Sequence, residues 1–139
     1  MQIKNFEDLE IWKAARHLTR EIYALSKTSQ LSKDYGLRDQ MQRAAVSIMA
    51  NIAEGFERGG NQEFVQFLYI AKGSCGEIRS QLYVALDQKY IDERATDNLL
   101  IILKRLSVMI KHLIDHLKRS GLRGPKYGGS DQSRPSEGI

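Results

Sequence analysis

The chain has little proline or cysteine and no long apolar run. Its two prolines, Pro125 and Pro135, leave the first 124 residues free of any obligatory helix break. The single cysteine, Cys75, cannot form an internal disulfide or a thiolate metal cage, so no oxidising compartment is required. The sequence contains no run of about 18 apolar residues, so it predicts no membrane span. The N-terminus lacks a basic segment followed by an apolar one, so we expect no signal peptide and a cytoplasmic, membrane-free protein.

The composition is that of one globular domain. The 139 residues are 42% hydrophobic and 27% charged, which is enough apolar material for an ordinary core and excludes a fully disordered chain. The net charge is +4, from 21 Lys and Arg against 17 Asp and Glu. This mild excess permits contact with nucleic acid without requiring it.

Apolar residues recur at spacings of three and four along most of the chain, which is typical of amphipathic helices. The pattern predicts an all-α fold, an antiparallel up-down four-helix bundle over residues 1–120, because three short connections favour antiparallel neighbours. The segment 121–139 is rich in Gly, Ser and Pro and predicts a disordered tail. The four helices are expected at about residues 6–27, 37–58, 62–89 and 93–120.

Short polar residues and glycines mark the expected helix ends. Asn5 or Asp8 is a candidate N-cap for the first helix, Asn61 for the third and Asp92 for the fourth. Gly59-Gly60 is a stop signal after the second helix.

The fourth helix is apolar at five of its seven heptad positions. A surface helix of a monomeric bundle needs a much narrower apolar face. Two neighbours are therefore expected to cover it, and the second is most simply another copy of the chain. The alternative is a monomer whose loops or tail cover the second face.

The two remaining heptad positions of this helix are basic. Residues 104–119 hold five Lys and Arg against Asp115, a sum of +4 that equals the net charge of the chain. A row of such side chains is a candidate contact for a phosphate backbone, and a solvated helix face is the alternative. No aromatic residue interleaves with them on this helix, so the helix offers no stacking platform. The candidate residues are Lys104, Arg105, Lys111, Lys118 and Arg119.

The second helix carries one polar stripe, formed by Gln40, Arg43, Ser47, Asn51, Glu54 and Arg58. Ser and Asn are poor choices inside a helix, so the stripe predicts either a hydrogen-bonded junction between helices or a plain solvent face. On the third helix the small residues 73–76 predict close helix approach, and Glu77 follows within reach of Arg43.

Four segments together resemble a known family. They are FEDLEIWKAA at 6–15, YGLRDQ at 35–40, RAAVSIMANIAEG at 43–55 and IAKGSCGE at 70–77. The chain resembles the four-helix-bundle proteins first noticed as open reading frames within bacterial 23S ribosomal RNA intervening sequences. That resemblance implies an antiparallel bundle that assembles into cyclic homopentamers. A related branch, the accessory proteins of diversity-generating retroelements, binds nucleic acid.

The resemblance also implies which residues belong to the family signature, and it brings no catalytic residue with it. These signature positions are Arg43, Ser47, Asn51, Glu54, Gly55 and Glu77.

Recognisable catalytic and cofactor motifs are missing from the sequence. No phosphate-binding glycine loop or dinucleotide fingerprint occurs. His112 and His116 lie four residues apart, but Leu113 stands where a zincin has glutamate. Cys75 lies among core positions and is expected to be a buried small hydrophobe. We therefore expect no enzyme, metal, cofactor or small-molecule substrate.

Two functional hypotheses remain. The first is association with RNA or DNA through the basic residues of the fourth helix. The second is a protein-interaction scaffold that does not bind nucleic acid.

Overall fold

The computed structural model describes residues 3–28 and 30–121. These residues form four helices and no strand, the all-α fold that the sequence predicts. The predicted tail lies outside the described residues apart from Gly121, which ends the last helix. The elements are the short 3-10 turns η1 (Phe6–Asp8) and η2 (Leu31–Lys33), and the helices α1 (Glu10–Ser26), α2 (Tyr35–Glu57), α3 (Asn61–Asp87) and α4 (Glu93–Gly121).

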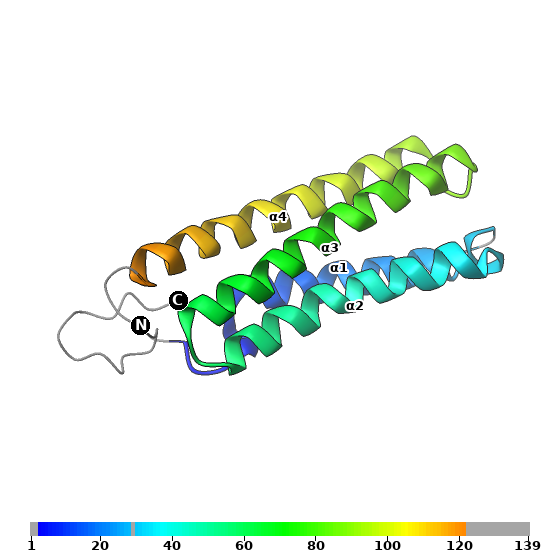
Figure 1. Ribbon diagram of the computed structural model, residues 1–139. Coiled ribbons are helices and arrows are strands. Elements are labelled where there is room, and N and C mark those ends of the chain that lie inside the picture. Colours follow the sequence, from blue (N-terminus) through cyan, green and yellow to red (C-terminus); the bar gives the residue numbers. More distant parts are fainter. Residues whose placement is uncertain (1–2, 29, 122–139) are drawn as a thin grey trace.

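The helices run alternately up and down, as Figure 1 shows. Each helix packs against its neighbours in sequence, and α1 also contacts α4, which closes the bundle. One apolar core runs through the centre, where every helix contributes fully buried side chains such as Leu18, Ile48, Leu68 and Leu103. Within the described residues, no helix is long and apolar enough to span a bilayer.

The start of α1 differs from the prediction. Phe6–Asp8 form a 3-10 turn, and α1 begins at Glu10 with Leu9 as the N-cap residue. Neither Asn5 nor Asp8 caps α1, because Leu9 has an extended backbone and its side chain is buried in the core. Burial of this leucine therefore determines where the helix begins.

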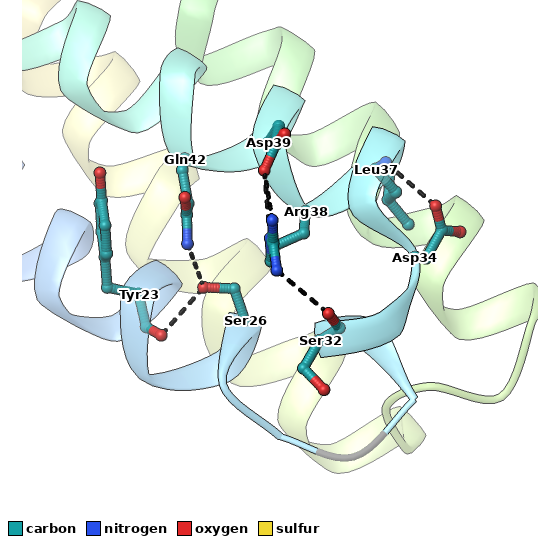
Figure 2. Close-up of polar contacts among 8 residues, drawn as sticks. All are labelled: Tyr23, Ser26, Ser32, Asp34, Leu37, Arg38, Asp39 and Gln42. Carbon is teal, nitrogen blue, oxygen red and sulfur yellow. Dashed lines mark hydrogen bonds and ion pairs between the residues drawn. The ribbon is translucent and has the colours of Figure 1, made fainter.

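The start of α2 also lies earlier than predicted. The helix begins at Tyr35 instead of at about residue 37, and it therefore contains Gly36. Asp34 is the N-cap: its Oδ1 accepts a hydrogen bond of 3.1 Å from the backbone N–H of Leu37 (Figure 2). The acid just before the helix therefore stabilises its first turn.

Polar contacts hold the connection between α1 and α2, as Figure 2 shows. Arg38 donates to the carbonyl of Ser32 at 3.1 Å and forms an ion pair with Asp39 at 3.0 Å. Gln42 of α2 donates to the Ser26 hydroxyl at the end of α1 at 2.8 Å. These bonds tie the end of α1 and the Leu31–Lys33 turn to α2.

The connection between α2 and α3 is very short. Gly59 has a φ of 87°, in the left-handed region that favours glycine, and Gly60 is the N-cap residue of α3. The prediction that Asn61 caps α3 is wrong. Asn61 is the first residue of the helix, and its buried Nδ2 donates to the carbonyl of Leu117 at 3.2 Å. Its side chain joins the beginning of α3 to the end of α4.

The connection between α3 and α4 is tied to the first hairpin. Asp92 caps α4 through a 2.8 Å hydrogen bond from the backbone N–H of Ala95, in agreement with the sequence. The Tyr90 hydroxyl donates to Oδ2 of Asp34 at 3.0 Å, and this bond raises the pKa of Tyr90 above its usual value. One carboxylate thus caps α2 and binds the other hairpin.

Candidate nucleic-acid interface

The apolar positions of α4 are mostly covered within the chain. Ile102 and Met109 are half-buried and pack against the core. Only Ile101 and Val108 remain exposed, at 49% and 53%. One chain therefore covers four of the five apolar heptad positions, and the face left for a second copy is narrower than the sequence predicts. The buried members are Leu99, Leu100, Leu103, Leu106, Ile110, Ile114 and Leu117.

The five predicted basic residues all lie exposed on α4. Lys104, Lys111 and Lys118 form one row, because residues seven apart lie almost above one another on a helix. Arg105 and Arg119 belong to a second row. Ile101, Val108 and the half-buried Asp115 lie between the two rows. We call this surface, made of the row 104–111–118, the row 105–112–119 and the residues between them, the basic face.

One acid partly neutralises the basic face. Lys111 Nζ lies 2.7 Å from Oδ1 of Asp115, and this contact raises the pKa of Lys111 and lowers that of Asp115. An exposed pair of this kind adds little stability. Among the described residues, Lys104, Arg105 and Arg119 form no ion pair, so their charges are available to a ligand.

The third lysine of the row contacts an aromatic residue of α3. Lys118 Nζ donates to the Tyr69 hydroxyl at 2.8 Å and lies 5.1 Å from the ring centroid. The hydrogen bond from Lys118 lowers the pKa of Tyr69 below its usual value. Tyr83 occupies the same heptad position of α3 two repeats later. Tyr69 and Tyr83 remain 43% and 51% exposed.

The sequence does not reveal that these tyrosines of α3 lie on the surface next to the basic face. On α4 itself no aromatic residue interleaves with the basic residues. The neighbouring helix α3, however, places the ring of Tyr69 beside Lys118. Tyr69 and Tyr83 share a heptad position outside the apolar stripe of α3, and this position predicts that both rings are exposed. The sequence does not give the register between α3 and α4, so it cannot predict that the rings lie near the lysines.

Three of the six signature residues line a groove between α2 and α3. Arg43, Ser47 and Glu77 line this groove, which has a volume of about 490 Å³. Glu77 accepts a hydrogen bond from Gln81 at 3.3 Å. Within the described part of the chain, Arg43 and Glu77 do not form the ion pair that the sequence suggests. The remaining lining residues are Gly36, Asp39, Gln40 and Ala44.

The polar stripe of α2 is bonded on one side and solvated on the other. The Ser74 hydroxyl of α3 donates to the Ser47 hydroxyl at 3.1 Å, and Asn51 donates to the same oxygen at 3.0 Å. Glu54 and Arg58 are exposed and form an ion pair at 3.0 Å. The stripe is therefore a hydrogen-bonded junction between helices at Ser47 and Asn51, and a solvent-exposed face at Glu54 and Arg58.

The close approach of α2 and α3 depends on a glycine of α2. A Cβ atom at Gly55 would lie 2.7 Å from Cβ of Phe67 and 2.9 Å from Cδ1 of Phe64. The prediction that the small residues of α3 provide the contact is wrong for its glycines, because a Cβ atom at Gly73 or Gly76 meets no atom within 4 Å. Gly55 is thus the signature position with a clear packing role.

Among the described residues, the cysteine and histidines considered above do not form a catalytic or metal site. Cys75 is buried, and this burial raises the pKa of its thiol to about 12, so it is not a thiolate at neutral pH. His112 is exposed and His116 is half-buried. The described residues contain no group of three or more His, Cys, Asp or Glu side chains placed to hold a metal ion.

Residues 7–112 match the family described as 23S rRNA-intervening sequence protein. The chain belongs to this family. The match spans α1 to α3 and includes Lys104, Arg105 and Lys111, whereas Lys118 and Arg119 lie beyond it.

A solved structure has the same fold as this 23S rRNA-intervening sequence family member. It is a protein of unknown function from the S23 ribosomal protein family of Bacteroides thetaiotaomicron, with a TM-score of 0.69 and 20% identity. The similarity covers 75% of this chain and 97% of that one. No curated protein sequence matches the chain.

Proposed function

We propose that this protein is a non-enzymatic nucleic-acid-binding protein, with RNA as the expected ligand and the basic face of α4 as the contact. The observation that carries the proposal is the exposure of all five basic residues along one side of a single helix. Phosphate contacts need cations that are exposed and regularly spaced, and these side chains meet both requirements.

The test is RNA binding measured at several salt concentrations. The variant Lys104→Gln/Lys111→Gln/Lys118→Gln should bind a short structured RNA more weakly than the native protein. Its plot of log affinity against log salt should be less steep, by about 0.7–0.9 for each phosphate that the variant no longer binds.

A matched control removes the same charge elsewhere. Lys13, Lys27 and Lys33 are exposed residues outside α4, so their triple Gln variant has the same net charge as the test variant. Equal weakening by both variants would contradict a specific role of the basic face. Absence of RNA binding by the native protein at low salt would contradict the proposal itself.

We propose further that copies of the chain associate, with a cyclic pentamer as the expected assembly. Supporting this are apolar side chains outside the basic face that are roughly half exposed on α2 and α3. Exposed apolar groups of this kind are typical of interfaces when they are contiguous. They are Val46, Ile70 and Val84.

A protein-interaction scaffold is the second candidate function. The groove between α2 and α3 favours it, because Arg43 and Glu77 line that groove without pairing to each other within the described residues, and their charges are available to another protein. A scaffold of this kind would capture its partner equally well after the three lysines of α4 are neutralised.

A further inference from the structure

The surface between α3 and α4 combines two exposed aromatic rings with a row of lysines. Tyr69 and Tyr83 are 14 residues apart on α3, which corresponds to about 21 Å along the helix axis. Gly76 lies midway between them, and a Cβ atom there would meet no atom within 4 Å. The surface is therefore open at Gly76.

The hydrogen bond from the Asn61 side chain of α3 to the carbonyl of Leu117 of α4 sets the register of this surface. Because α3 and α4 are antiparallel, moving seven residues back along α4 corresponds to moving seven residues forward along α3 (Figure 1). Lys111 therefore lies nearly level with Tyr69, and Lys104 lies nearly level with Gly76. Lys111 and Lys118 thus lie beside the first ring, and Lys104 lies between the levels of the two rings along the helix axis.

This arrangement distinguishes between kinds of nucleic acid. An aromatic side chain stacks on the flat face of a base, and those faces are accessible in single strands but covered in a duplex. Lysines beside the rings bind the phosphates that connect the stacked bases. The surface carries both kinds of group along one line, as a single-strand site requires.

We propose that the α3–α4 surface binds single-stranded nucleic acid, with bases stacked on Tyr69 and Tyr83 and phosphates held by Lys104 and Lys118. This inference rests on the proposed function and names the ligand class of the basic face. Lys111 contributes less because Asp115 holds its ammonium at 2.7 Å.

The test compares a labelled single-stranded RNA of about 12 nucleotides, a length within the range of known single-strand sites, with the duplex of the same sequence by fluorescence anisotropy. The native protein should prefer the single strand. The variant Tyr69→Leu/Tyr83→Leu should bind the single strand at least about 30-fold more weakly, as expected when two stacked bases are lost, and should bind the duplex unchanged.

Three controls make the outcome decisive. Tyr69→Phe/Tyr83→Phe keeps both rings and should retain single-strand binding although the Lys118 hydrogen bond is absent. Tyr35→Leu removes an exposed tyrosine of α2 that is distant in sequence from both rings, and should have no effect. Circular dichroism melting should show that every variant is folded, because the replaced side chains lie at the surface.

The possible failures differ from one another. If the leucine variant binds the single strand as the native protein does while the lysine variant loses binding, the stacking inference is wrong and the proposed function stands. Equal affinity of the native protein for single strand and duplex would also overturn the inference. If neither RNA binds at low salt, both proposals are wrong.

Discussion

At the residue scale, the contact between Lys118 and Tyr69 gives one tyrosine unusual acid–base behaviour. The ammonium stabilises the phenolate, so Tyr69 should ionise at a lower pH than an ordinary tyrosine. Its pKa is lower in the folded than in the unfolded state. The resulting stabilisation is therefore present above the unfolded pKa and is lost as the pH falls through the folded pKa.

This behaviour can be measured by ultraviolet titration of tyrosinate, as the difference between the native protein and Tyr69→Phe. The difference curve should lie below the usual tyrosine range in the native background. It should return to that range when Lys118→Gln removes the ammonium. A difference curve already at the ordinary pKa in the native background would show that the hydrogen bond does not form in solution.

The exposure of a side chain could be predicted from the sequence where it depends on the residue's own helix. The contacts of a side chain with another helix could not. The exposure of Lys104 and Arg105 follows from the heptad pattern of α4 alone. The position of Tyr69 beside Lys118 depends on how α3 slides against α4. No local propensity determines that offset, because packing of the whole core sets it.

At the scale of elements, the tight contact between α2 and α3 makes glycine necessary at one position. Gly55→Ala should destabilise the fold by up to about 2 kcal/mol, because a forced shift of Phe64 and Phe67 costs about 1–3 kcal/mol and better helix propensity returns about 1 kcal/mol. Gly73→Ala enters open space on the same pair of helices and should stabilise the protein by up to about 1 kcal/mol.

Urea unfolding of the two alanine variants measures both effects. Opposite signs of the change in unfolding free energy are the expected result. A destabilised Gly73→Ala variant would mean that this position is covered by something outside the described chain, such as a second copy. An unchanged Gly55→Ala variant would mean that the two helices can separate without cost.

The helices themselves were predictable and several of their ends were not. Periodicity identified all four helices because each buries a long apolar stripe. The predicted N-caps of α1 and α3 were wrong because the sequence rule counts short polar residues, whereas the ends are set by tertiary contacts. Leu9 is drawn into the core, and the Asn61 side chain is used to bind α4.

At the scale of the whole molecule, the exposed apolar side chains predict self-association. Light scattering of the native protein should give a mass above 15.9 kDa and near a multiple of it, five copies being the expected number. The variant Val46→Lys/Ile70→Lys should lower that mass, because charged residues in an apolar interface prevent close packing.

The control is the exposed pair Lys13→Gln/Lys27→Gln, which changes charge outside those apolar positions and should leave the mass unaltered. A native protein with the mass of one chain would contradict the assembly. It would leave the RNA test unaffected, because the α3–α4 surface is complete within one chain.

The hydrogen bond between Tyr90 and Asp34 has a consequence for how the bundle opens. The hairpin of α1 and α2 and the hairpin of α3 and α4 are joined covalently through Gly59 and Gly60, at the end of the bundle opposite this bond (Figure 1). At the far end, Asp34 binds Tyr90 with one oxygen and caps α2 with the other. The Asp34 carboxylate therefore stabilises both the first turn of α2 and the contact between the two hairpins. Because loss of this carboxylate's position breaks both bonds, fraying of that turn and separation of the hairpins at this end are cooperative.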